Sequence, residues 1–156
     1  MDLTANTKKW RQTLGNLGEQ IASDYLVEMG FELWARNYRA HRLGEIDLIA
    51  SKDDQALVFA EVKTRMAGQA TLEDHSGQLA VDVRKQRKII NTAFHFVDLN
   101  RVKIGKKKRI LQFDVMLIDY HLSRGQVLAL LVADDIAMLR KHAKVLHIPE
   151  AFGRFQ

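Results

Sequence analysis

The sequence contains no cysteine among its 156 residues. Disulfides, thiolate metal sites and a cysteine nucleophile are therefore excluded, and the composition fits a reducing compartment. No apolar run reaches the roughly 18 residues that a membrane-spanning helix requires. Residues 1–15 also lack the apolar core of a secretory signal. These absences predict a cytoplasmic protein with no membrane partner.

Composition and charge narrow the class of protein. Hydrophobic residues make up 47% of the chain and charged residues 28%, which is ordinary for a folded globular protein and excludes a wholly disordered one. A chain of this length can bury a full core, so we expect a single domain over residues 1–156. The net charge of +5 points to nucleic acid or an anionic membrane surface. Because many basic proteins bind neither, charge alone leaves the partner open.

The spacing of apolar residues alternates between helical and strand periods, which predicts an α/β fold. In order, the predicted elements are a loose arm over 1–12, a helix over 13–29, strands over 31–39, 45–51 and 57–65, a loop over 66–78, a helix over 81–97, a basic connection over 100–109, and strands over 110–120 and 127–132. The short polar connection over 52–55 predicts an antiparallel hairpin between its flanking strands.

Residues 123–147 form a C-terminal extension whose role the sequence pattern leaves open. Asp134 is a candidate N-cap for a further helix that includes Ile136 and Leu139. Pro149 is the only proline, and we expect it to end any such element.

Charged residues interrupt the two most apolar strands, which surround the predicted hairpin turn. Asp47 interrupts one strand, and Glu61 and Lys63 interrupt the next. A buried charge without a partner has an unfavourable desolvation energy of about several kcal/mol, so this placement needs a reason. Because side chains alternate along a strand, Glu61 and Lys63 are expected on the same face, with Asp47 across from Glu61 or one strand further along.

Two interpretations of these charges remain open from the residues themselves. Asp47 and Glu61 would repel each other unless a cation neutralised them, and Mg²⁺ is a hard ion that binds through a few carboxylates and keeps several waters. Lys63 could then hold an attacking water or stabilise charge on a phosphate, as in a centre that cleaves phosphodiesters. The alternative is an ordinary set of cross-strand ion pairs on a solvated sheet face.

Several motifs add a resemblance to a known family. A glutamate in a helix, an aspartate in a strand and E-V-K in the following strand resemble the PD-(D/E)XK nuclease pattern. More closely, the chain resembles the uncharacterised bacterial YraN family, which is similar in its core to archaeal Holliday-junction resolvases. The motifs that carry this resemblance are G-E-Q-I-A (18–22), N-Y-R (37–39), G-E-I-D-L-I-A (44–50), V-F-A-E-V-K-T-R (58–65), R-K-Q-R-K (84–88), F-D-V (113–115) and I-P-E-A-F (148–152).

The resemblance implies a restriction-endonuclease-like α/β core, in which helices flank a mixed central β-sheet. It implies that Asp47 and Glu61 are metal ligands for Mg²⁺, with Mn²⁺ as a substitute. Glu19 would complete the metal site, directly or through water, and the Val62 carbonyl would be a further ligand. Lys63 would be the catalytic lysine. The position of Glu19 at the edge of its helix's apolar stripe is explained by this role.

Basic residues are predicted to contact nucleic acid, expected to be DNA, through its phosphates. These candidates are Arg39, Arg42, Arg65, Arg84, Lys85, Gln86, Lys88, Lys106, Lys107 and Lys108. The resemblance implies that Lys85 and Gln86 approach the scissile phosphate. It also suggests a homodimer, since a two-fold dimer suits a four-way junction.

Three functional hypotheses follow. The first is a Mg²⁺-dependent DNA endonuclease that acts on branched or Holliday-junction-like DNA. The second is a non-catalytic accessory protein that binds nucleic acid and retains a nuclease fold. The third is a basic interaction module in which the hairpin charges form only ion pairs. The presence of Glu19, Asp47, Glu61 and Lys63 together favours the enzyme, because a protein that only binds would be free to lose any of them.

Overall fold

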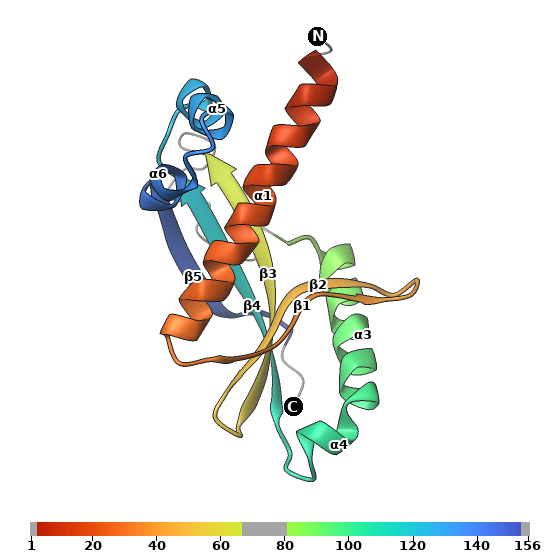
Figure 1. Cartoon of the computed structure of the whole chain (residues 1–156). Coiled ribbons are helices and arrows are strands. Elements are labelled where there is room, and N and C mark those ends of the chain that lie inside the picture. The colour runs from red at the N-terminus through yellow and green to blue at the C-terminus, as the bar shows by residue number, and fades with distance from the viewer. Residues whose placement is uncertain (1–2, 67–80, 154–156) are drawn as a thin grey trace.

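A five-stranded sheet in the order β1-β2-β3-β4-β5 forms the centre of the molecule (Figure 1). The computed structural model describes residues 3–66 and 81–153, with side chains from residue 8 onward. Its elements are α1 (Leu3–Glu28), β1 (Glu32–Ala40), β2 (Gly44–Lys52), β3 (Ala56–Met66), α3 (Val83–Leu99), α4 (Arg101–Ile104), β4 (Ile110–Tyr120), α5 (Arg124–Val132), α6 (Ile136–Lys141) and β5 (Ala143–Phe152). The loop predicted over 66–78 lies outside the described residues, except for Met66.

The sheet is mixed, because β3 and β4 are parallel whereas the other neighbouring strands are antiparallel. Parallel strands need a long crossover connection, and α3 lies within the segment that joins β3 to β4. The predicted α/β fold with a restriction-endonuclease-like core is confirmed. The predicted hairpin is also confirmed, since β2 pairs with β3 from Lys52↔Ala56 to Leu48↔Ala60.

Two hydrophobic cores form on opposite faces of the sheet. One core packs α1, through residues such as Leu14 and Leu26, against Ala60 and its neighbours on the strands. The other packs α3, through residues such as Phe96, against Phe59. Because both faces are covered, the central strands carry mainly apolar residues, which a few charged and polar side chains interrupt.

The first helix is longer than expected. Residues 3–12, predicted as a loose arm, belong to α1, and that prediction is therefore wrong for them. The cause is Trp10, which is buried and extends the apolar stripe of Leu14 and Leu17 by one turn. The surrounding Lys and Arg residues made this turn appear solvated. As predicted, Gly30 ends the region, with a positive φ of 89°.

The segment over 100–109 is not simply an irregular connection, because it begins with the short helix α4 (Arg101–Ile104). The prediction of a strand over 127–132 is wrong, because residues 124–132 form the helix α5. Ser123 caps this helix by accepting a hydrogen bond from the Gln126 backbone N–H at 3.2 Å, and the Gln126 side chain in turn accepts from the Ser123 N–H at 2.9 Å. This reciprocal capping box favours a helix over a strand.

The C-terminal extension completes the sheet. Asp135, and not Asp134 as predicted, caps α6 by accepting from the Met138 N–H at 3.1 Å. Pro149 does not end an element, because it lies inside β5. An edge strand tolerates proline, since its outer side has no ladder to lose. Residues 123–147 thus supply α5, α6 and the first half of β5, and α5 and α6 cover the α1 side of the sheet (Figure 1).

No helix in the described part of the chain is long and apolar enough to cross a membrane.

Two close approaches position the helices. At Gly18, a Cβ would collide with the Thr64 hydroxyl on β3, so this residue lets α1 lie close to the sheet. At Gly44, where β2 begins, φ is +149° and a Cβ would lie 3.1 Å from Thr92 Oγ1 on α3. Glycine is therefore needed where the β1–β2 hairpin meets α3.

We expect Gly44→Ala to destabilise the protein by about 1–3 kcal/mol, because alanine disfavours this φ and crowds α3. Chemical denaturation would measure the change. Gly15→Ala is the matched control: nothing lies within 4 Å of its added Cβ, and alanine should stabilise a helix by about 0.5–1 kcal/mol. Equal stabilities of the Gly44 variant and the unmodified protein would contradict the expectation.

Candidate active site

The main-chain ladder between β2 and β3 stops beside Asp47. The last pair is Leu48↔Ala60. One residue further along, Asp47 Oδ2 accepts a hydrogen bond from the Val62 backbone N–H at 2.7 Å, so a side chain satisfies a donor that the ladder leaves free. Ile46 and Leu48 belong to opposite cores, which shows that strand alternation breaks at Asp47. The two strands therefore separate at this carboxylate.

Asn37 lies on β1 beside the same break. Its neighbours Arg36 and Tyr38 pair with β2, while Asn37 itself has a φ of +49°. Asparagine tolerates this conformation better than most residues. Its side chain donates a hydrogen bond to the Glu19 carboxylate from α1. Asn37 was not identified from the sequence as a site residue, although asparagine is depleted in strands and its presence there was a usable signal.

Glu61 lies on the α3 side of the sheet and is only 3% exposed. Its Oε1 is 3.5 Å from Lys63 Nζ and 2.6 Å from Lys85 Nζ. Lys85 comes from the first turn of α3, which Asp82 caps by accepting from the Lys85 backbone N–H at 2.8 Å. The charges thus form ion pairs around a buried carboxylate, in contrast to the solvated sheet face that the simplest interpretation required.

Asp47 and Glu61 are in direct contact. Burial raises the pKa of Asp47 to about 7, together with the negative charge of Glu61 and a hydrogen bond that Asp47 donates to Glu61 when protonated. The Val62 N–H opposes this rise, and the charge of Glu19 adds to it. Burial likewise raises the pKa of Glu19, against the hydrogen bond from Asn37. The charges of neighbouring acidic groups therefore disfavour ionisation of both Asp47 and Glu19.

The same acidic groups shift the pKa of Lys85. Burial alone lowers this pKa, but the hydrogen bond to Glu61 and the charges of Glu61, Asp47 and Glu45 outweigh burial and raise it. Clusters of perturbed ionisable groups are typical of functional sites.

The donor set is compatible with a small hard cation. In the described residues, no three acidic or histidine side chains form a group that could hold a metal ion. Asp47 and Glu61 form a close pair, whereas Glu19 interacts with it only through charge. Mg²⁺ typically binds through one or two carboxylates and keeps several waters, so this pair fits Mg²⁺ better than ions that need many protein ligands. The Val62 carbonyl stays a predicted ligand.

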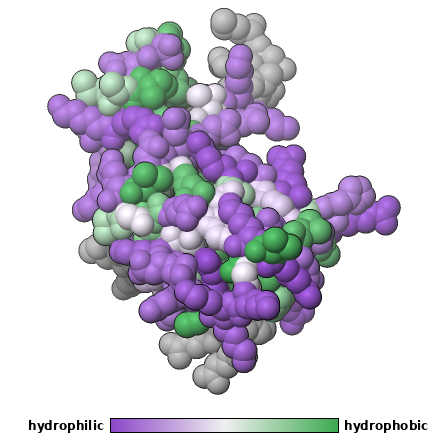
Figure 2. Space-filling view, turned by 60° about the horizontal axis from the view of Figure 1, so that its bottom comes forward, coloured by the Kyte–Doolittle hydropathy of each residue, from purple (hydrophilic) through white to green (hydrophobic). Residues whose placement is uncertain are grey.

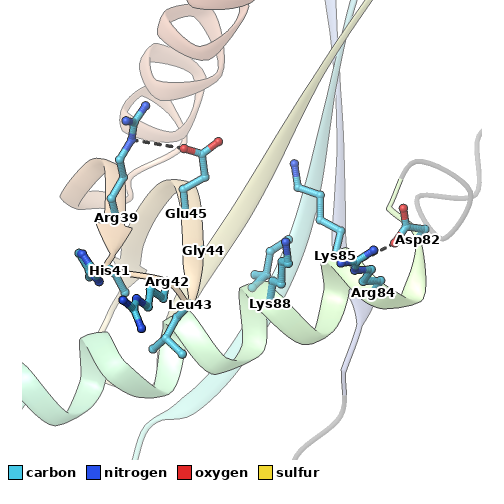
Figure 3. A pocket seen from close by; sticks show the side chains of 12 residues that line it. Arg39, His41, Arg42, Leu43, Gly44, Glu45, Asp82, Arg84, Lys85 and Lys88 are labelled. Atoms are coloured by element: carbon cyan, nitrogen blue, oxygen red, sulfur yellow. Dashed lines mark hydrogen bonds and ion pairs between the residues drawn. The ribbon is translucent and has the colours of Figure 1, made fainter.

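A basic pocket adjoins the acidic pair. It has a volume of about 1000 Å³ and lies between the β1–β2 hairpin and the first turns of α3 (Figure 3). The basic side chains that line it are Arg39, His41, Arg42, Arg84, Lys85 and Lys88. Glu45 and Asp82 also line it, and Arg39 Nε is 3.3 Å from Glu45 Oε2. The arginines and lysines among them are predicted nucleic-acid contacts, whereas His41 was not identified from the sequence.

The remaining predicted nucleic-acid residues lie elsewhere. Arg65 pairs with Asp119, with Nε 2.9 Å from Oδ1. The Gln86 amide donates to the Val81 carbonyl at 2.8 Å. Lys106 and Lys107 line a second pocket beside α4, Lys107 Nζ is 2.8 Å from Asp54 Oδ2, and Lys108 is exposed in the same segment. Figure 2 brings forward the end of the molecule that carries α4, which is the bottom of Figure 1. Hydrophilic residues predominate on the face that it shows.

Comparison with known proteins identifies the family. The family model described as Uncharacterised protein family UPF0102 matches residues 18–118. The chain belongs to this family. The sequence-based resemblance to the YraN family, which is the same family, is thereby confirmed. The UPF0102 match begins at Gly18, next to Glu19, and includes Asn37, Asp47, Glu61 and Lys85.

Three relatives, each called a UPF0102 protein, illustrate the similarity. The protein of Trichlorobacter lovleyi is 42% identical over 94 residues, covering 60% of this chain and 70% of the relative. The protein of Caldicellulosiruptor bescii is 38% identical over 105 residues, covering 67% and 81%. That of Synechococcus sp. (strain JA-3-3Ab) is 37% identical over 108 residues, covering 69% and 76%. These names state no activity, so a functional proposal depends on the geometry.

The raised pKa of Asp47 predicts a pH-dependent stability. The folded protein retains a proton that the unfolded chain releases near pH 4, so this contribution to stability is complete below pH 4 and is lost as pH rises through about 7. We therefore expect the unfolding free energy of the Asp47→Asn variant, measured relative to that of the unmodified protein, to increase by about 2 kcal/mol as the pH rises from 5 to 8. Denaturant titrations in metal-free buffer would measure it.

Asp54→Asn is the control for this measurement. Asp54 lies in the β2–β3 turn, where hydrogen bonding to Lys107 and the charges of Lys107 and Arg109 lower its pKa. Removal of this carboxylate should therefore not increase the free energy of unfolding at any pH. A stability difference for Asp47→Asn that is the same at pH 5 and pH 8 would contradict the assigned pKa.

Proposed function

We propose that the protein is a Mg²⁺-dependent endonuclease that hydrolyses phosphodiester bonds of DNA. The observation that carries the proposal is the contact between the Asp47 and Glu61 carboxylates where β2 and β3 separate, with Lys63 beside Glu61. Two buried carboxylates in contact are unfavourable by themselves, and a divalent cation relieves their repulsion. UPF0102 membership is consistent with this activity without specifying it.

In the proposed enzyme, Asp47 and Glu61 would hold the metal. Bound Mg²⁺ supplies a Lewis acid that favours attack by water and neutralises phosphate charge. Asp47 is oriented by the Val62 N–H, and Glu61 by the ammonium groups of its lysine neighbours. Lys63, with a side chain 35% exposed, can reach both Glu61 and substrate. Its role is to orient the attacking water or to stabilise charge on the phosphate.

Glu19 acts at the edge of the proposed centre. Asn37 fixes its carboxylate by a hydrogen bond, so Glu19 can accept a hydrogen bond from a water near the acidic pair. In the overall reaction, the water oxygen bonds to phosphorus and the bond from phosphorus to one ester oxygen breaks. A proton passes to the departing oxygen, which leaves a phosphate monoester and a hydroxyl group.

The basic pocket is the proposed route for the nucleic-acid strand. It adjoins the acidic pair through Lys85, which contacts Glu61 and also lines the pocket. Its arginines and lysines would bind phosphates and position the backbone, without selecting a base sequence. The resemblance to archaeal resolvases favours branched DNA, including four-way junctions, as the substrate. A homodimer would match the two-fold symmetry of such a junction.

A second candidate function is binding of nucleic acid without catalysis. The observation in its favour is the 2.6 Å distance between Lys85 Nζ and Glu61 Oε1, because an internal cation already pairs with Glu61, one member of the acidic pair. Such an arrangement can stabilise the fold in the absence of a metal ion.

A cleavage assay distinguishes the two candidates. Single-stranded, duplex, flap and four-way-junction DNA should be incubated with the protein and Mg²⁺, Mn²⁺ or a chelator. We expect cleavage only with a divalent ion, and Asp47→Asn, Glu61→Gln and Lys63→Met should each reduce its rate at least about a hundredfold. Asp54→Asn, a carboxylate change outside the site, should cleave normally. Cleavage that persists in chelator would rule out the proposed centre, and binding without cleavage would support the second candidate.

Nucleic-acid binding should depend on the pocket more than on the segment after α4. We expect Arg42→Ala and Arg84→Ala each to weaken DNA binding and to reduce the slope of log affinity against log salt by about 1, as for one lost phosphate contact. Lys107→Ala is the comparison, because its ammonium already pairs with Asp54 and its loss should matter less. Fluorescence anisotropy over a salt series would measure this. A larger loss for the Lys107 variant would assign the main contact surface to the other end of α3.

A further inference from the structure

Lys85 belongs to two sites at once. Its ammonium lies 2.6 Å from Glu61 Oε1, and the same side chain lines the basic pocket. Figure 3 shows it extending from α3 towards the sheet, beside Arg84 and Lys88 on the pocket wall. The side chain is 39% exposed, so the ion pair forms at the border between the buried acidic pair and solvent.

Glu61, the partner of Lys85, is a buried carboxylate that is unfavourable without a counter-charge. The Glu61 side chain is 4% exposed and contacts the Asp47 carboxylate. Lys63 also approaches it, but at 3.5 Å, so Lys85 at 2.6 Å is the nearer cation. A buried carboxylate requires a counter-charge, and here that charge is on a flexible side chain anchored outside the sheet.

Lys88 provides the contrast that makes Lys85 distinctive. It lies one turn further along α3 and lines the same pocket. Among the described side chains, Lys85 forms an ion pair with Glu61 and Lys88 does not. The Lys88 ammonium can therefore bind a phosphate without first breaking an ion pair with Glu61.

We propose that Lys85 is an exchangeable counter-cation: it pairs with Glu61 when no divalent ion is bound, and the divalent ion displaces it to contact a nucleic-acid phosphate in the adjoining pocket. This inference rests on the proposed metal site at Asp47 and Glu61. One ammonium cannot satisfy the carboxylate and a phosphate equally well. Binding of the divalent ion and of nucleic acid is therefore positively coupled, and by linkage each raises the affinity of the other equally.

The exchange makes a prediction that a merely structural ion pair does not. Lys85→Met keeps the length of the side chain and removes its charge, so the divalent ion no longer competes with an internal cation. Its affinity in the absence of nucleic acid should rise about five- to tenfold, at the low end of typical couplings because Lys85 is partly exposed. Affinity for nucleic acid should fall, and its dependence on the divalent ion should shrink. A merely structural pair would leave the coupling between the divalent ion and nucleic acid unchanged, because loss of a nearby positive charge by itself also favours the divalent ion.

The test combines two measurements on the full chain. Calorimetric titration with Mn²⁺ in the absence of DNA gives the affinity for the ion. Anisotropy of labelled phosphorothioate DNA, with and without Mn²⁺, gives the coupling without turnover. Lys88→Met is the matched control, and should weaken DNA binding while leaving Mn²⁺ affinity unchanged. Lys85→Arg retains a cation and should keep Mn²⁺ affinity near that of the unmodified protein.

The outcomes separate this inference from the proposed function. Tighter Mn²⁺ binding by Lys85→Met, with weaker coupling to DNA, supports the exchange. Unchanged or weaker Mn²⁺ binding by that variant overturns it, while loss of binding in Asp47→Asn would still support the metal site. Absence of Mn²⁺ binding by the unmodified protein overturns both. Circular dichroism confirms folding, and Lys85→Gln replaces Lys85→Met if the methionine variant folds poorly.

Discussion

The hydrogen bond from the Val62 N–H to the Asp47 carboxylate is the interaction on which the site depends. At 2.7 Å, it replaces a main-chain bond where the β2–β3 ladder has ended at Leu48↔Ala60. The strands can therefore separate without leaving a buried donor unsatisfied. This separation frees the β1–β2 hairpin to reach the N-terminal turns of α3, and it brings Asp47 into contact with Glu61. The acidic pair and the basic pocket both follow from the same local break in the sheet.

Opposite charges meet here because two helices approach the break from opposite faces of the sheet. Through Gly18, α1 lies close to β3, and it carries Glu19 to Asn37, where the charge of Glu19 acts on the acidic pair. From the other face, α3 supplies Lys85, whose ammonium offsets that charge. The resulting balance leaves one carboxylate, Asp47, with a pKa near neutrality. Such a balance destabilises the folded state at alkaline pH, a cost that functional sites often carry.

Parts of the fold were predictable because the signals were local. Apolar spacing located the strands of the hairpin and β4, and glycine marked the end of α1. Other parts depended on contacts that a window of sequence does not contain. Trp10 extended α1 because it packs in a core assembled from distant strands. Pro149 was compatible with β5 because this strand lies at the sheet edge, which only the strand order reveals. At α5, by contrast, the capping box of Ser123 and Gln126 was a local signal that strand-like composition obscured.

The sequence alone determined the residue types of the candidate site and their pattern. Asp47, Glu61 and Lys63 were identifiable because carboxylates and an ammonium in apolar strands are unfavourable without a partner, and Glu19 was added by the family resemblance. Only the tertiary structure decided how those charges are balanced. It brought Asn37 to Glu19 and Lys85 to Glu61, and it divided the basic residues between the pocket and the far end of α3. Electrostatic energies depend on distance and burial, and both are set by the packing of helices and strands that are far apart in the chain.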